Sequence, residues 1–149
     1  MGEAERPLFI VNVEGVVRRG GTYLLSVRSE RESHAPGTLS LPGGKVEVGD
    51  AAQDTLEHTL KRETLEETGV EVVNPVYLES KWFRADDGEP VVDIVFLCEY
   101  AGGVAETGDS NEISAVMWLT AAEVAVHSKA PAWTRQSIEK AEQIGRGAA

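Results

Sequence analysis

Several residue types that characterise other classes of protein are scarce in this chain of 149 residues. Its single cysteine, Cys98, cannot form an internal disulfide, and it lies in an apolar run from 91 to 100 that predicts a strand. Without a second cysteine or clustered histidines, the sequence offers no zinc site. We therefore expect Cys98 to be a small core residue in a reducing cytoplasm.

Long hydrophobic runs are also lacking. No apolar stretch approaches the roughly 20 residues that a membrane-spanning helix needs, and residues 1–7 contain no hydrophobic segment of a signal peptide. The apolar fraction of 42% is nonetheless ordinary for a globular protein, and the length suffices for one core. We expect a single domain over residues 1–149, located in the cytoplasm and not bound to a membrane.

Positive charge is scarce as well. The chain has 14 lysines and arginines against 25 aspartates and glutamates, so its formal net charge is −11. A surface of this sign repels the backbone of nucleic acids, and we expect no binding of a nucleic-acid duplex. A phosphate-containing ligand would need positive charge at its site, and bound divalent cations supply that charge most compactly.

The most informative segment that is present covers residues 62–70 and reads R-E-T-L-E-E-T-G-V. Its glutamates Glu63, Glu66 and Glu67 are spaced to lie on one face of a helix, within a turn of each other. Like charges so placed repel, so such a face is either a solvated surface or a site for a hard cation such as Mg²⁺. A glycine-rich loop at 41–45 precedes it. This combination indicates metal-assisted phosphate chemistry.

These residues resemble the signature of the Nudix hydrolases, G-x5-E-x7-R-E-U-x-E-E-x-G-U, in which U is an apolar residue. The match runs from Gly44 to Val70, with Thr64 at one of the apolar positions. It departs from the signature in spacing. Asp50 follows Gly44 by the required six positions, but eleven residues rather than seven separate Asp50 from Arg62.

A four-residue insertion at 50–53, in the loop before the helix, accounts for this spacing. Asp54 then takes the position of the family's first glutamate. We predict that Asp54 is also the N-cap of the helix and that Glu57 completes a capping box with it. Asp50 remains the alternative for the position of that glutamate.

The resemblance also implies how a metal is held. Glu63, Glu66 and Glu67 would bind Mg²⁺ or Mn²⁺ together with the backbone carbonyl of Gly43. A water activated by the metal would then attack phosphorus in a diphosphate. Glu63 is alternatively a candidate for the general base.

Residues outside this set complete the predicted site. Arg62 would orient the carboxylates. Glu112 is our candidate for the further glutamate that many members of the family recruit from a late loop, with a catalytic and metal-binding role. Substrate contacts are expected from four residues near the predicted cleft: Arg28, His34, Lys45 and Arg84.

The apolar pattern agrees with the fold that the resemblance implies. Strands are predicted at 8–17, 22–28, 70–83 (interrupted near Asn74 and Pro75), 91–100 and 113–119. A helix is predicted at 54–68, a short one after a capping box at 120–123, and a last one from Pro131. The resemblance implies an α/β fold, the α/β/α Nudix sandwich with a mixed central sheet.

The expected substrate is a small molecule with a diphosphate linkage, of the nucleoside di- or triphosphate type. Subfamilies for ADP-ribose, dinucleoside polyphosphates or coenzyme A carry extra markers, among them a proline or tyrosine. Residues 85–88 have neither, which favours a nucleoside triphosphate or a broad range of (d)NTP-like substrates. Two alternatives stay open: a non-catalytic ligand-sensing domain, and an allylic diphosphate isomerase, for which no cysteine is suitably placed. The sequence also leaves a homodimer open.

Overall fold

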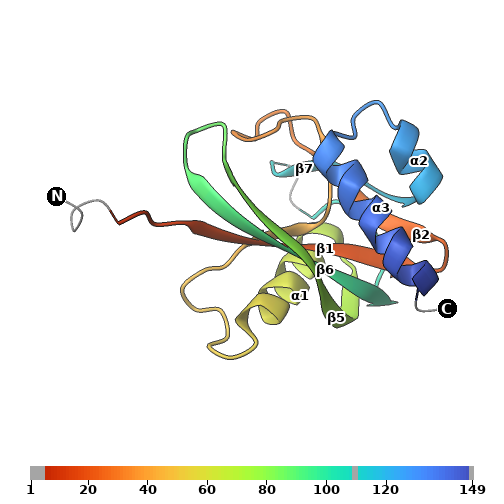
Figure 1. Cartoon of the computed structure of the whole chain (residues 1–149), viewed down its shortest axis with the longest axis horizontal. Helices are drawn as coiled ribbons and strands as arrows, with labels where there is room; N and C mark the ends of the chain where they lie inside the picture. Colours follow the sequence, from red (N-terminus) through yellow and green to blue (C-terminus); the bar gives the residue numbers. More distant parts are fainter. Residues whose placement is uncertain (1–5, 109–110, 148–149) are drawn as a thin grey trace.

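The computed structural model describes residues 6–108 and 111–147, and Figure 1 shows the arrangement of their helices and strands. The strands are β1 (Ile10–Arg19), β2 (Thr22–Arg28), β3 (Leu39–Ser40), β4 (Gly43–Lys45), β5 (Glu71–Arg84), β6 (Pro90–Gly102) and β7 (Ile113–Thr120). The helices are α1 (Thr55–Thr68), α2 (Ala121–Val126) and α3 (Ala132–Gly147). None of the described helices is both long enough and apolar enough to cross a membrane.

Strand β1 connects the two halves of the sheet. It runs parallel to β6, from Ile10 opposite Val91 to Arg18 opposite Glu99, and β6 continues antiparallel into β5. Its N-terminal half also pairs antiparallel with β4, whereas its last residues form a hairpin with β2. Strand β2 carries β3 and β7 as its other antiparallel neighbours. The sheet is therefore mixed, as predicted.

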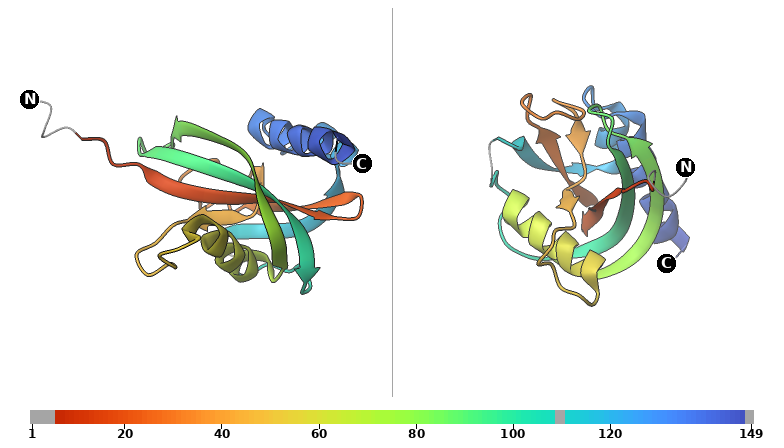
Figure 2. Two further views of the ribbon diagram at one scale, coloured as in Figure 1. Left: turned by 60° about the horizontal axis from the view of Figure 1, so that its bottom comes forward. Right: turned by 90° about the vertical axis from the view of Figure 1, so that its left-hand side faces the viewer.

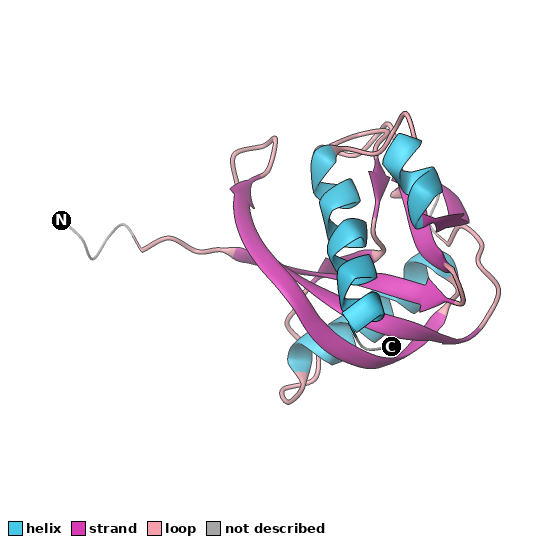
Figure 3. Cartoon of the chain, turned by 45° about the vertical axis from the view of Figure 1, so that its right-hand side comes forward, coloured by secondary structure: helices cyan, strands magenta, loops and turns pink. Residues whose placement is uncertain are grey.

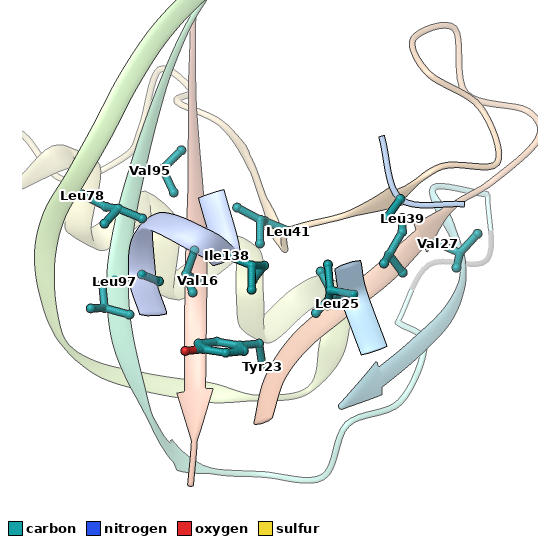
Figure 4. Packing of buried hydrophobic residues seen from close by; sticks show 13 residues of the cluster. Val16, Tyr23, Leu25, Val27, Leu39, Leu41, Leu78, Val95, Leu97 and Ile138 are labelled. Atoms are coloured by element: carbon teal, nitrogen blue, oxygen red, sulfur yellow. The ribbon is translucent and has the colours of Figure 1, made fainter. Parts of the chain in front are cut away.

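Helices cover both faces of the β1, β5 and β6 part of the sheet (Figures 2 and 3). On one face, α3 buries Ile138 against a cluster that includes Val16 and Leu97 (Figure 4). On the other face, α1 buries Leu60 against a cluster that includes Val13. Alternate residues of β1 thus point to opposite helical layers, as strand geometry requires. The predicted α/β/α sandwich is confirmed.

Helix α1 forms where its apolar spacing predicts. Leu60 and Thr64 are fully buried, and Gly69 ends the helix in a left-handed conformation, with its N–H bonded to the carbonyl of Leu65. The loop prediction for residues 50–53 is confirmed, because the helix begins at Thr55.

The predicted capping box at the start of α1 is wrong. Asp54 is the N-cap residue, but its side chain makes no capping hydrogen bond. The backbone of Asp54 is left-handed, with φ 51°, whereas a side-chain cap usually requires an extended N-cap residue. The capping box of α2 is confirmed, since Thr120 and Glu123 exchange hydrogen bonds of 2.8 and 3.1 Å.

Two strand predictions need correction. Strand β5 is not interrupted near Pro75; it runs continuously, and the left-handed Asn74 lies where its pairing with β6 shifts register. Strand β4 lies in a segment predicted as a loop, because its glycines carry no apolar pattern. Cys98 is buried in the core as expected, and burial raises the pKa of its thiol to about 12.

Candidate active site

The predicted acidic face of α1 lies against the glycine strand β4. Strand β4 pairs with β1, with Gly43 opposite Glu14 and Gly44 opposite Val13. A Cβ atom on Gly44 would lie 2.3 Å from Cδ of Glu63, and one on Gly43 would lie 2.0 Å from the Val13 carbonyl oxygen. Only glycine at position 43 therefore permits this approach of β4 to β1, and a side chain at position 44 would displace the Glu63 carboxylate.

A cleft of about 340 Å³ opens between α1, β4 and the start of β7. We call it the acidic cleft, because six carboxylate side chains and only two basic ones line it. The acidic residues are Glu14, Glu32, Glu47, Glu63, Glu67 and Glu112, and the basic ones are Arg28 and Lys45. Glu63, Glu67, Glu112 and Gly43, four of the residues predicted to bind metal, are thus brought to one cleft.

The electrostatic setting of the cleft disfavours ionised carboxylates. Burial, with the charges of Glu63 and Glu112, raises the pKa of Glu67 to about 8. A hydrogen bond from the Gly43 backbone opposes this rise. The pKa of Glu63 is also raised, because the effect of burial exceeds the opposing effect of the neighbouring Arg62. A cation in the cleft would remove the repulsion that these groups share.

The donor chemistry of the cleft fits a hard divalent cation, because carboxylate and carbonyl oxygens are the ligands that Mg²⁺ and Mn²⁺ take. Within residues 6–108 and 111–147, no group of three or more acidic, histidine or cysteine side chains is gathered closely enough to form a coordination sphere. Glu66 lies outside the cleft, with a side chain that is 61% exposed and 3.4 Å from Arg62.

Arg62 occupies the centre of a hydrogen-bond network between the acidic face and the loop before α1. Its Nε and one terminal nitrogen donate to the two carboxylate oxygens of Asp50, at 2.8 and 3.0 Å. Its other terminal nitrogen donates to Glu63 at 2.8 Å and to Glu66 at 3.4 Å. Arg62 therefore links the inserted loop directly to a predicted metal ligand.

Asp50 is fully provided with hydrogen-bond donors. Besides Arg62, the backbone N–H of Glu47 donates to it at 2.7 Å and the hydroxyl of Thr59 at 3.2 Å. These bonds, led by those from Arg62, lower the pKa of Asp50 to about 2. Of the two aspartates considered for the position of the family's first glutamate, it is Asp50 that accepts hydrogen bonds from Arg62.

A second cavity, of about 480 Å³, adjoins the acidic cleft on the side of β5 and β6. We call it the aromatic cavity, because His34, Phe83 and Trp133 line it. The His34 ring stacks on Phe83, with ring centroids 5.2 Å apart and planes inclined by 20°. Its apolar wall also includes Ile10 and Val91. This volume lies within the range of small-molecule sites.

The loops that carry His34 and Asp86 are bonded to each other at the rim of this cavity. The backbone N–H of Asp86 donates to Nδ1 of His34 at 3.1 Å, and the N–H of Ala35 donates to the Asp86 carboxylate at 2.9 Å. Arg28 supports the same loop, because its Nε donates to the His34 carbonyl at 2.9 Å and its side chain pairs with Glu32.

The four residues predicted to bind substrate therefore lie around the two cavities. Arg28 and Lys45 line both, whereas His34 and Arg84 line only the aromatic cavity. Arg84 also donates to the carbonyl of Gly88 at 3.2 Å.

Sequence reasoning missed several polar residues of the site, and three of them lie on the central strands β1 and β6: Asn12, Glu14 and Asp93. All three line the aromatic cavity, and Asn12 and Glu14 also line the acidic cleft. Asp93 is only 1% exposed. Burial and the adjacent Asp93 raise the pKa of Glu14. The sequence did contain a signal for these residues. They are acidic or amide residues within strands that are otherwise apolar, and such residues are seldom placed towards a core without a reason.

Comparisons with known proteins agree with this geometry. The family model for the NUDIX domain matches residues 8–141. A MutT-like protein from Streptomyces ambofaciens is 38% identical over 122 residues, which cover 79% of this chain and 68% of that protein. An ADP-ribose pyrophosphatase from Methanocaldococcus jannaschii is 32% identical over 102 residues, which cover 66% of this chain and 56% of that protein.

A similar structure extends the comparison to the whole fold. The crystal structure of a MutT protein from Methanosarcina mazei Go1 superposes with a TM-score of 0.77 and 28% sequence identity. The alignment covers 95% of this chain and 98% of that one. The chain thus matches that structure along nearly its full length, but spans only about half to two thirds of the two curated relatives above.

Proposed function

Because the chain belongs to the NUDIX domain family, we propose that it is a metal-dependent pyrophosphohydrolase for nucleotide-type substrates. It cleaves a diphosphate linkage in a nucleoside diphosphate joined to another group, which includes nucleoside triphosphates. One observation carries the proposal: a cleft lined by Glu63, Glu67, Glu112 and Gly43 adjoins a larger aromatic cavity, with which it shares six lining residues. The first suits a cation and a diphosphate, and the second suits a nucleoside.

The residues that would hold the metal are Glu63, Glu67 and Glu112, with the carbonyl of Gly43. A bound Mg²⁺ or Mn²⁺ would neutralise phosphoryl oxygens and lower the pKa of a water. Glu67 contributes a carboxylate whose ionisation is costly without a cation, because burial and Glu63 oppose its charge. Glu66 remains a predicted ligand, although its side chain lies at the rim beside Arg62.

The remaining charged residues position these groups and the substrate. Arg62 restricts the Glu63 side chain by its hydrogen bond of 2.8 Å, and Asp50 in turn fixes the Arg62 guanidinium at two points. Lys45 lies where both cavities meet and is suited to contact a phosphate. Glu63 keeps its alternative role as general base, for which its hydrogen bond to Arg62 provides an orientation.

The nucleoside part of the substrate matches the aromatic cavity in size and polarity. An aromatic base has apolar faces that match Phe83 and Trp133, whose side chains line the same space. The two alternatives find less support. An isomerase would need a reactive cysteine, but Cys98 is buried in the core and lines neither cavity. A purely sensing domain would have no use for the link from Asp50 through Arg62 to Glu63.

A nucleotide panel tests the proposal. Nucleoside triphosphates and nucleoside diphosphates linked to sugars or to a second nucleoside would be incubated with Mg²⁺, with Mn²⁺ and with excess chelator. Phosphate release, measured with and without added pyrophosphatase, distinguishes the bond that is cleaved. We expect metal-dependent turnover that Glu63→Gln abolishes and Glu139→Gln, on the exposed side of α3, leaves intact. Binding of nucleotides without turnover would instead support the sensing alternative.

A further inference from the structure

The acidic cleft and the aromatic cavity share a boundary that we call the neck. It consists of the residues that line both cavities. These are Asn12, Glu14, Arg28, Glu32, Ser40 and Lys45. Any molecule that occupies both cavities must therefore place its middle part against these side chains.

Three polar side chains lie next to one another at the neck and on the adjoining wall of the aromatic cavity, and we call them the polar array. Asn12 and Glu14 are two residues apart on β1, so their side chains lie on one face of the sheet. The parallel register of β1 and β6 places Asp93 opposite Asn12, and the Asn12 amide donates to Asp93 at 2.9 Å. Burial, with the charge of the adjacent Asp93, raises the pKa of Glu14. Asp93, which is almost fully buried, fixes the Asn12 amide in place.

The polar array lies on a face of β1 and β6 that is apolar farther along both strands. Val16 lies two residues beyond Glu14 on β1, and Val95 lies two residues beyond Asp93 on β6. Both valines belong to the cluster beneath α3. The same face of both strands therefore changes from hydrocarbon to carboxyl and amide groups where it reaches the neck. Buried polar groups at such positions are costly unless they have hydrogen-bond partners.

The chemistry of the neck restricts what it can contact. Arg28 and Lys45 at the neck suit the phosphate end of the substrate. Directly beside Glu14 a diphosphate would be repelled by the carboxylate, and the faces of an aromatic base match the apolar wall rather than carboxyls. Sugar hydroxyls are uncharged, and they donate to carboxylates and accept from amides. In a nucleoside diphosphate the sugar lies between the base and the phosphates. The order of the cavities therefore matches the order of groups in the substrate.

We propose that Glu14 and Asn12 bind the ribose hydroxyls of the substrate and make the protein selective for ribonucleotides over their 2′,3′-dideoxy counterparts. This inference rests on the proposed function, because it assumes that the diphosphate occupies the acidic cleft. A site built to hydrogen-bond a substrate hydroxyl discriminates strongly against the analogue that lacks it, since its own polar groups are then left unpaired. We expect kcat/KM to be at least about tenfold higher for a ribonucleotide than for its 2′,3′-dideoxy counterpart.

The test compares this ratio in the wild type and in variants of the neck. Glu14→Leu should lower kcat/KM for the ribonucleotide, leave that for the dideoxynucleotide nearly unchanged, and bring the ratio close to one. Its unfolding temperature should not fall, because the substitution removes a half-buried acid whose charge is opposed by Asp93. Glu99→Leu is the matched control: Glu99 lies on β6, pairs with Arg18 and lines neither cavity. It should leave the ratio as in the wild type.

Other results would overturn the inference. Equal turnover of both sugars by the wild type would exclude hydroxyl recognition, and a ratio that survives Glu14→Leu would exclude Glu14. A higher Mg²⁺ requirement in Glu14→Leu, equal for both sugars, would make Glu14 a metal ligand instead. If no nucleotide is hydrolysed, the proposed function fails. Calorimetric binding of the same ribo and dideoxy pair then still decides the role of the neck, since it needs no turnover.

Discussion

Two groups of carboxylates flank α1 in opposite electrostatic settings. In the acidic cleft, Glu67 has Glu63 and Glu112 as neighbours, and burial with their charges raises its pKa to about 8. In the inserted loop, Asp50 accepts hydrogen bonds from Arg62, Thr59 and the Glu47 backbone, and its pKa falls to about 2. Asp50 forms an ion pair with Arg62 at 2.8 Å, whereas the charge of Arg28 only partly offsets those of Glu63 and Glu112 at Glu67.

The difference separates a binding role from a positioning role. The two carboxylate oxygens of Asp50 already accept four hydrogen bonds from protein groups, so they are poorly suited to bind a metal or a substrate. Asp50 therefore acts by positioning Arg62. A buried carboxylate surrounded by like charges needs a partner from outside, and a divalent cation is the simplest one. Arg62 joins the two settings, because it holds Asp50 with one side of its guanidinium and Glu63 with the other.

The largest expected effect comes from Glu67→Gln. The amide keeps the shape of the side chain but is a weak ligand for a hard cation, so we expect kcat/KM to fall by roughly a thousandfold. Steady-state kinetics at saturating Mg²⁺ measures this. Glu66→Gln is the comparison within the same helix, and it should lose far less, because Glu66 lies outside the cleft. Equal losses in both variants would show that the exposed rim also belongs to the metal site.

A smaller effect is expected for Asp50→Asn. The substitution removes the charge that fixes Arg62 at two points, and loss of such a supporting contact typically costs about 10- to 100-fold in metal affinity or activity. The Mg²⁺ concentration for half-maximal rate should rise accordingly. Asp54→Asn is the matched control, because Asp54 makes no side-chain contact at the cap. A larger loss in Asp54→Asn would assign the position of the family's first glutamate to Asp54 after all.

The sequence predicts the helix and its acidic face well, because both depend on residues within one turn of each other. Glu63 and Glu67 needed only the helical repeat, and Leu60 and Thr64 gave the buried side. Residue spacing could not show whether Asp50 or Asp54 forms hydrogen bonds with Arg62. Asp50 lies twelve positions before it, and the path of the inserted loop brings its carboxylate back to the helix.

The neck was beyond sequence reasoning for a related reason. Asn12 and Asp93 are 81 positions apart and meet only through the parallel register of β1 and β6. A sequence with alternating residues shows which side chains share a face of one strand, but it does not show which strands are adjacent. The polar residues on apolar strands were visible, and their convergence was not.

The two carboxylate settings should also give opposite responses to pH in the metal-free protein. The folded-state pKa of Glu67 is about 8, above its ordinary value of 4.5, so its contribution to stability is full below 4.5 and is lost as the pH rises towards 8. For Asp50 the pKa is lowered from 3.8 to about 2, so its contribution is present above 3.8 and is lost as the pH falls towards 2. We expect the unfolding temperature to drop by a few degrees between pH 5 and 8.

The control for this pH response is the Glu67→Gln variant, in which the drop between pH 5 and 8 should shrink. Mg²⁺ should have the same effect on the wild type, since a bound cation favours the ionised carboxylate. Calorimetry in chelator and in Mg²⁺ measures both. A wild-type unfolding temperature that stays constant over this range would mean that Glu67 is ionised without a cation.

The smallest expected effect concerns the buried side of the same helix, where Thr64 stands at a position that the Nudix signature gives to an apolar residue. Thr64 is fully buried, and its hydroxyl has no hydrogen-bond partner within the described residues. Thr64→Val has nearly the same shape, so it should raise the free energy of unfolding by about 1 kcal/mol and leave kcat/KM unchanged.

The control is Thr68→Val, which should lower the free energy of unfolding, because the Thr68 hydroxyl donates to the Thr64 carbonyl at 2.7 Å and accepts from the N–H of Val70. Urea unfolding of both variants measures the two changes. A loss of activity in Thr64→Val would mean instead that packing beneath α1 sets the positions of Glu63 and Glu67, and that the helix transmits changes from its buried side to the cleft.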